Sequence, residues 1–136
     1  MIPKFRAWLK REKQMVSVVG ISFYQDSFDV EEIFVYDQEN PHKYGDLWEE
    51  PFLPYEFVLM QSTGLKDING KEIYEGDVVL CEWGEIGDNV YTNAEKTVVD
   101  SSPHNLVMLE EADRLQILGN IYENPELKKE LMEVIE

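Results

Sequence analysis

The sequence has few of the residues from which most catalytic and metal sites are built. Its only cysteine is Cys81, and its two histidines, His42 and His104, lie 62 residues apart. One cysteine can form neither an intramolecular disulfide nor, by itself, a cysteine metal site. The motifs Cys-x-x-Cys, His-x-x-x-His and Gly-x-Ser-x-Gly are missing, and the segment 84–87 lacks the lysine and the hydroxyl residue of a phosphate-binding loop. We therefore expect no catalytic residue, no cofactor and no metal, and we interpret Cys81 as a small core residue.

Long hydrophobic runs are also missing. The longest apolar runs, Val78–Cys81 and Phe57–Met60, are far shorter than the roughly 20 residues that a membrane-spanning helix needs. The N-terminus has no apolar stretch of signal-peptide length, so we expect a cytoplasmic protein that makes no contact with a membrane. A length of 136 residues with 43% hydrophobic residues indicates one folded domain with a single core.

Basic residues are scarce and unevenly placed. The chain has 28 acidic and 12 basic residues, a net charge of −16. Residues 1–14 carry +4 and the remaining 122 residues carry −20, with ten acids against Lys43 alone in residues 25–56. Nucleic-acid binding depends on Lys and Arg that neutralise phosphates, so this balance disfavours direct binding of DNA or RNA. The acidity serves solubility, or else it imitates a nucleic acid.

The patterning predicts many short strands. Alternating or β-branched segments indicate strands at 5–9, 15–24, 29–36, 57–62, 78–83, 89–92, 97–100, 106–109 and 115–121, with a helical turn at 110–114. In the second of these, Val19, Ile21 and Phe23 share one face and Gly20 suggests a bulge. The pair Asn69-Gly70 tolerates positive φ at both central positions of a tight turn, which predicts a hairpin between 65 and 73.

The end of the chain predicts a helix over 125–135. Asn124 suits an N-cap and Pro125 the first helical position, and apolar residues then recur on one face at Leu127, Leu131, Val134 and Ile135. A helix this short is marginal alone, so it must pack on its own sheet or on a neighbouring subunit. We predict a mainly β (α+β) fold: a small barrel-like arrangement of short antiparallel strands with a short C-terminal helix.

A long acidic loop at 37–56 carries the candidate contact residues. Proline residues and a dense run of acids indicate irregular structure there. Aromatic side chains cluster in this loop and just after it, at Tyr44, Trp48, Phe52, Tyr55 and Phe57. Because acids surround them, these rings do not suit stacking on nucleic-acid bases. They form either a patch for binding another protein or a cover folded back over the core, and the sequence leaves both open.

Three blocks of sequence together form a recognisable pattern. The first is KFRAW at residues 4–8, followed by Met15-Val16, and the last is LGNIYENPEL at residues 118–127. The longest is LMQSTGLKDINGKEIYEGDVV at residues 59–79. With these blocks in this order, the chain resembles the YopX-like family of phage and prophage proteins. The resemblance spans nearly the whole chain and implies a single domain, residues 1–136. Its parts are a basic N-terminal strand and turn (1–14), the acidic variable loop (37–56), a core block (57–83) and the C-terminal helix.

The resemblance implies a small accessory protein made by a phage or prophage inside a bacterial host cell, with no catalytic residues to carry over. Our first hypothesis is a non-enzymatic protein that acts by self-association (a homo-oligomer) and by contact with a host or phage protein. One alternative is an acidic decoy that occupies the DNA-binding groove of a host protein. A second is a carboxylate-based hydrolase, for which the adjacent pairs Glu31/Glu32, Glu49/Glu50 and Glu110/Glu111 are the available acids.

Overall fold

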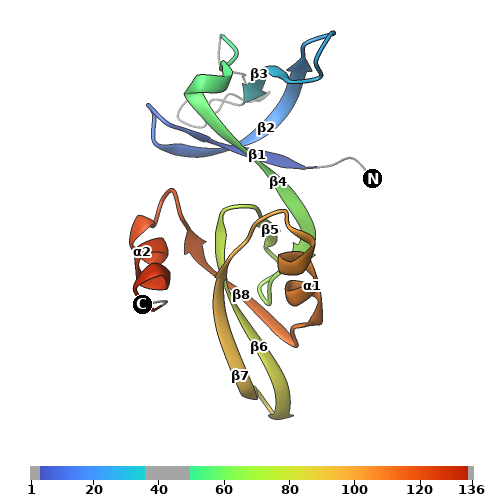
Figure 1. Ribbon diagram of the computed structural model, residues 1–136, viewed down its shortest axis with the longest axis vertical. Helices are drawn as coiled ribbons and strands as arrows, with labels where there is room; N and C mark the ends of the chain where they lie inside the picture. The colour runs from blue at the N-terminus through green and yellow to red at the C-terminus, as the bar shows by residue number, and fades with distance from the viewer. Residues whose placement is uncertain (1–3, 36–49, 135–136) are drawn as a thin grey trace, which may run out of the picture. The chain divides into compact units, whose positions relative to one another are not determined.

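The computed structural model describes residues 4–35 and 50–134 (Figure 1). The chain divides after Gln61 into two compact units, which are described separately below as the N-terminal unit and the C-terminal unit. The strands form a five-stranded sheet of order β3-β2-β1-β4-β5 and a three-stranded sheet of order β7-β6-β8. All strand pairs are antiparallel. The two sheets confirm the predicted mainly β fold. The single domain stays a prediction.

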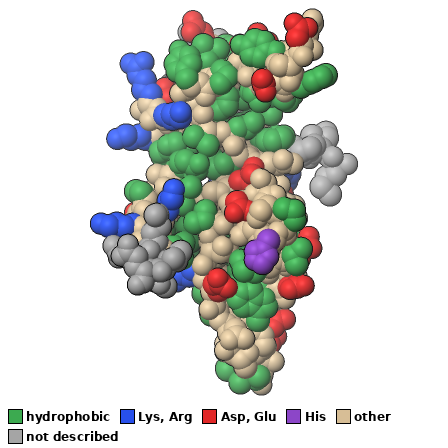
Figure 2. Space-filling model, in the orientation of Figure 1, with side chains coloured by type: hydrophobic (Ala, Val, Ile, Leu, Met, Phe, Trp, Pro, Cys, Tyr) green, Lys and Arg blue, Asp and Glu red, His purple; other side chains and the backbone are tan. Residues whose placement is uncertain are grey.

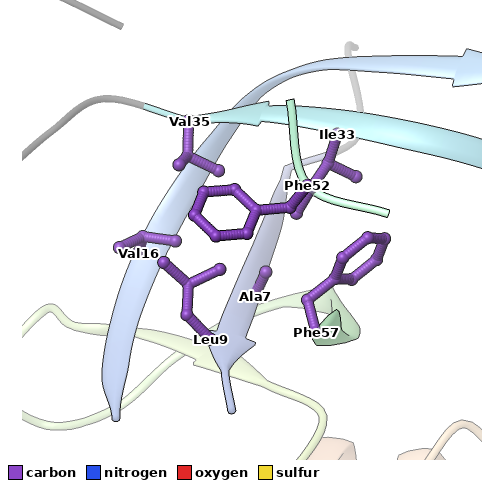
Figure 3. Close-up of a cluster of buried hydrophobic side chains, with 7 residues drawn as sticks. All are labelled: Ala7, Leu9, Val16, Ile33, Val35, Phe52 and Phe57. Atoms are coloured by element: carbon purple, nitrogen blue, oxygen red, sulfur yellow. The ribbon is translucent and has the colours of Figure 1, made fainter. Parts of the chain in front are cut away.

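The N-terminal unit is built around β1 (Phe5–Leu9). This strand pairs on one side with β2 (Gln14–Phe23) and on the other with the first half of β4 (Phe57–Lys66), and β3 (Val30–Val35) lies outside β2. The short 3₁₀ helix η1 (Pro54–Glu56) leads into β4. The core of this unit consists of Ala7, Leu9, Val16, Ile33, Val35, Phe52 and Phe57. Figure 3 shows the Phe52 ring lying among Val35, Ile33 and Leu9.

A bulge in β2 changes which of its residues face the core. The pairing with β3 shifts between Val18 and Gly20, so the predicted bulge at Gly20 is confirmed. Strict alternation predicted Val19, Ile21 and Phe23 on one apolar face, and this prediction is wrong. Val18 and Ile21 pack against the core, whereas Val19 and Phe23 are exposed. The reason is that one extra residue reverses the alternation of side chains along a strand.

The C-terminal unit is built around β6 (Asp77–Gly87), which pairs with β7 (Val90–Val98) and β8 (Arg114–Asn120). The second half of β4 pairs with β5 (Glu72–Tyr74). The core of this unit consists of Ile73, Val79, Cys81, Val99 and Leu109. The registers with β8 end at Glu82, so the rest of β6 pairs with β7 alone and the two strands continue as a two-stranded ribbon.

The expected barrel is wrong, because both sheets stay open over the described residues. A barrel requires its end strands to pair with each other. In the five-stranded sheet, the outer edge of β3 is instead occupied by Phe52, whose N–H donates to Ile33 O at 2.9 Å and whose O accepts from Ile33 N at 3.0 Å. At β8, Ile68 N donates to Leu115 O at 2.8 Å. Loops therefore hold the edges that barrel closure would have used.

Helix α1 (Pro103–Glu111) replaces the strand predicted at 106–109 and the helical turn predicted at 110–114. The side chain of Ser102 accepts a hydrogen bond from Asn105 N, and Pro103 occupies the first turn. Ser followed by Pro is a strong helix-start signal, and it outweighs the apolar run Leu106–Leu109 that had indicated a strand. The helix buries Asn105 and Leu109.

The C-terminal helix α2 (Pro125–Val134) confirms the prediction as far as residue 134, and Ile135 lies outside the described residues. The helix contacts β7 and β8 of its own chain, so it packs on its own sheet. Over residues 4–35 and 50–134, neither helix is long and apolar enough to cross a membrane.

We predict that Gly119→Ala destabilises the protein by about 1–3 kcal/mol, the usual cost of overpacking. Gly119 has φ +155°, and a Cβ there would lie 2.5 Å from Asn124 Oδ1 and 2.9 Å from Leu127 Cδ1, at the contact between β8 and α2. Urea denaturation measures the change. Gly87→Ala is the matched control, since a Cβ there meets nothing within 4 Å, and we expect a change within about 0.5 kcal/mol. Equal effects at the two glycines would contradict the described packing of α2.

Candidate functional site

Four polar or charged residues are buried among the described residues: Asp67, Asp77, Asn105 and Asn120. Buried polar groups in a small domain are either partnered structural groups or candidates for chemistry. All four belong to the C-terminal unit. Their hydrogen bonds decide between these two roles.

Asp67 lies at the hairpin between β4 and β5. Gly70 N donates to Asp67 O, Asp67 N donates to Lys71 O, and Gly70 has φ +80°, the pattern of a three-residue hairpin loop with its last residue left-handed. The predicted tight turn is therefore confirmed, although positive φ occurs at Gly70 and not at Asn69. Asp67 Oδ1 accepts from Asn69 N and Lys71 N, both at 2.9 Å, and Oδ2 accepts from Ile117 N of β8 at 3.2 Å.

These donors determine the charge state of Asp67. Burial alone raises the pKa of the carboxyl, but the hydrogen bonds from Lys71, Ile117 and Asn69, together with the positive charge of Lys71, outweigh it, so the net pKa lies below its ordinary value. The carboxylate is thus ionised, and both of its oxygens accept hydrogen bonds from backbone N–H groups. It is a structural group.

Asp77 and Asn120 form a second junction where β5, β6 and β8 meet. Asp77 Oδ2 accepts from Tyr74 N at 2.9 Å, and Asp77 pairs with Asn120 across the β6–β8 ladder. Asn120 Oδ1 accepts from Tyr122 N at 3.0 Å and Glu123 N at 2.8 Å, which shapes the turn into α2. Both side chains accept hydrogen bonds from backbone N–H groups where strands end.

Asn105 does the same at the start of α1. Its Nδ2 donates to Val98 O and Thr97 Oγ1, both at 3.3 Å, and its Oδ1 accepts from Asp100 N at 3.1 Å. Hydrogen bonds from the side chain and backbone of Ser102 lower the pKa of Asp100, against a small opposing effect of burial and with a contribution from His104. This network attaches α1 to the end of β7.

The adjacent acid pairs do not converge where they are described. Glu31 and Glu32 are neighbours on β3, so their side chains point to opposite faces of the strand. Glu110 and Glu111 are both exposed at the end of α1, and Glu49 and His42 lie outside the described residues. Over the described part of the chain, no group of three or more His, Cys, Asp or Glu side chains that could hold a metal ion is found.

Cys81 is a buried core residue, as predicted. Burial raises the pKa of its thiol to about 11, and the carboxylate of Glu95, directly opposite on β7, adds to the shift. Since the thiolate is the reactive form, this environment makes Cys81 a poor nucleophile.

The structure separates the predicted contact residues. Tyr44 and Trp48 lie outside the described residues. Phe52 and Phe57 are core residues of the N-terminal unit. For these two rings, the prediction of a cover folded back over the core is confirmed. Tyr55 projects from η1 with 74% of its surface exposed. Of the described members, Tyr55 alone remains a candidate contact residue.

A second group of exposed rings lies at the end of β2 and in the loop that joins it to β3, where the sequence indicated no contact residues. Phe23, Tyr24 and Phe28 are 51%, 50% and 81% exposed. Tyr24 N donates to Asp29 O and Phe28 N donates to Tyr24 O, which closes the loop with Phe28 at φ 61°. Figure 2 shows hydrophobic and acidic side chains gathered at this end of the N-terminal unit. The sequence feature that could have indicated an exposed ring is Phe28 itself, a large aromatic residue between the polar residues Ser27 and Asp29.

We predict that Asp67→Asn destabilises the protein by about 1–3 kcal/mol at neutral pH, because an amide cannot accept from the donors on both sides of the carboxylate. Because the pKa of Asp67 is lowered in the folded protein, its ionised carboxylate stabilises the fold at pH values above the unfolded pKa of about 3.9. This stabilisation is lost as the pH falls through the folded pKa. The gap between the two proteins should therefore narrow in acid. Denaturation at several pH values measures it, with the exposed Asp88→Asn as the control. A gap that is independent of pH would contradict an ionised Asp67.

We predict that Cys81 reacts with a thiol reagent such as Ellman's reagent only slowly in the folded protein at pH 8. With a pKa of about 11, very little thiolate is present, and the side chain is fully buried. The reaction should become fast in denaturant, where the thiol has its ordinary pKa and is accessible. Rapid labelling of the native chain would show that the core of the C-terminal unit opens readily.

Comparison with known proteins places this architecture. No protein of curated function matches the chain. The chain is similar to protein EF1440 from Enterococcus faecalis, for which a crystal structure exists, with 29% identity and a TM-score of 0.51 over 93% of this chain and 98% of that one. The family model described as YopX protein matches residues 4–129, which confirms the resemblance drawn from the sequence blocks. The chain therefore belongs to the YopX protein family.

Proposed function

We propose that this chain is a non-enzymatic accessory protein of a phage or prophage, which works in the bacterial cytoplasm by self-association and by contact with other proteins. Membership of the YopX family supports the phage or prophage setting, through what the resemblance of the sequence blocks implies. The chemistry of the described residues supports the mode of action. A protein of this kind needs a rigid scaffold and exposed side chains that another protein surface can bury.

The observation that carries the proposal is the contrast between the buried polar and the exposed apolar side chains. Asp67, Asp77, Asn105 and Asn120 hold loops and strand ends through backbone hydrogen bonds. Large apolar side chains project instead into solvent, with Phe28, Tyr55 and Ile86 between 72% and 81% exposed. The buried polar groups thus stabilise the fold, whereas the exposed apolar side chains are available for contact with another protein. This distribution supports a protein that works by contact, because substrate chemistry depends on convergent polar groups.

Ile86 lies on the two-stranded ribbon that β6 and β7 form beyond Glu82, which Figure 1 shows extending from the rest of the C-terminal unit. Most residues of the ribbon are exposed on both of its faces. A two-stranded ribbon is marginally stable alone. A ribbon of this kind gains stability when a partner covers it, which adds to the case for contact.

We predict that the purified protein sediments as a species larger than the 15.9 kDa monomer, with a population that grows from low to high micromolar concentration. Sedimentation velocity or light scattering measures this. A strict monomer at high concentration would contradict the self-association part of the proposal. If such a monomer also bound a basic DNA-binding protein, and lost that binding as salt was raised, the acidic decoy would be the better function.

A further inference from the structure

The N-terminal unit has ends of opposite character, joined by β2. At the start of β2 lies the β1–β2 turn, which exposes Lys10, Arg11 and Lys13. At its other end lies the β2–β3 loop with its exposed rings. A strand of ten residues separates the two turns by about 33 Å. Figure 2 shows the Lys and Arg side chains of this unit gathered on one side of it.

The β2–β3 loop combines aromatic rings with negative charge. Residues 24–32 contain four acids, Asp26, Asp29, Glu31 and Glu32, and no base. Asp26 and Asp29 are exposed beside Tyr24 and Phe28. Aromatic faces attract Lys and Arg through cation–π interaction, and carboxylates beside the rings strengthen the attraction. The chemistry of this loop therefore fits a basic segment of a protein.

Phe28 occupies an unusual backbone conformation. Its φ of 61° lies in the left-handed region, where a bulky side chain costs conformational energy that glycine or asparagine would avoid. Its ring does not compensate by packing, because 81% of its surface is exposed. Residues with strained backbone cluster at ligand clamps and other functional sites, so this conformation makes Phe28 a candidate contact residue.

We propose that the aromatic–acidic loop of one molecule, residues 23–29, binds the basic turn of a second copy, residues 10–13. This inference rests on the proposed self-association and specifies its surfaces. The charges are complementary, since turn 10–13 contains three bases and one acid, whereas residues 23–29 contain two acids and no base. The two surfaces lie at opposite ends of β2, so the contact is head-to-tail. Such a contact joins copies into closed rings or open chains.

The first test compares four variants by sedimentation velocity. Phe28→Ala removes the most exposed ring, and the double variant Lys10→Glu with Arg11→Glu reverses the basic turn. Each should weaken self-association about tenfold or more, as loss of an interface anchor does. Matched controls are Val107→Ala, an exposed apolar residue of α1 in the C-terminal unit, and Lys128→Glu with Lys129→Glu, two exposed bases of α2. The controls should associate as the wild type does.

The second test separates contact from folding. Phe28→Gly relieves the left-handed strain, so it should leave the melting temperature unchanged or higher while still weakening association about tenfold. A purely structural Phe28 would give the opposite result, lower stability with unchanged association.

The third test is charge complementation. The variant Asp26→Lys with Asp29→Lys should not associate with itself as the wild type does, because its loop and its turn are then both basic. Mixed with the Lys10→Glu, Arg11→Glu variant, it should recover association, because the intact turn of the first variant faces the intact loop of the second and the reversed loop faces the reversed turn. Recovery in the mixture alone identifies the two surfaces as partners.

The outcomes separate this inference from the function on which it rests. Self-association that persists unchanged in Phe28→Ala and in the reversed turn overturns the head-to-tail contact and leaves the proposed function standing. A wild-type protein that is a monomer at every concentration overturns both. Loss of association in the control variants to the same degree would also overturn the contact, because the effect would then not be specific to these surfaces.

Discussion

The carboxylate of Asp67 is the group on which the C-terminal unit depends most. One oxygen holds the hairpin loop between β4 and β5 and the other bonds to Ile117 of β8, while the adjacent Ile68 bonds to Leu115. The hairpin is thereby attached along the edge of the three-stranded sheet, and Ile73 of β5 joins Leu115 and Ile117 in one hydrophobic cluster. A buried carboxylate without these donors would strongly destabilise the fold. The hairpin loop therefore depends on the Asp67 carboxylate to hold its backbone, and the buried carboxylate depends on the N–H groups of the loop.

Local signals predicted a large part of the fold. The strand at 5–9, the bulge at Gly20, the hairpin at Asn69-Gly70 and the C-terminal helix each depend on neighbours within a few residues, and each is present. The errors have two sources. At α1, the apolar run Leu106–Leu109 indicated a strand, whereas Ser102 followed by Pro103 begins a helix. For the barrel, the pairing of Phe52 with Ile33 and of Ile68 with Leu115 joins distant segments, which no local pattern reveals.

The candidate site was less predictable, for a related reason. An aromatic residue in an acidic loop looks the same in sequence whether it covers a core or faces solvent. Phe52 and Tyr55 are three residues apart, yet the first is buried and the second is exposed, because Phe52 pairs with β3 whereas Tyr55 lies on η1. Phe28 was missed because it lies in the loop after β2, where no periodicity of the sequence indicates whether a ring is buried or exposed. The bulge at Gly20 and the loop that follows it direct the nearby rings outward.

The hydrogen bond between Asp67 and Ile117 spans fifty residues of sequence, and this separation has a consequence for synthesis on the ribosome. The strands of the N-terminal unit pair with partners no later than Gln61, so this unit can fold as soon as that residue leaves the exit tunnel. In the C-terminal unit, the carboxylate of Asp67 lacks the hydrogen bond from Ile117 N until β8 has been synthesised. The N-terminal unit can therefore fold on the nascent chain before β8 has left the ribosome.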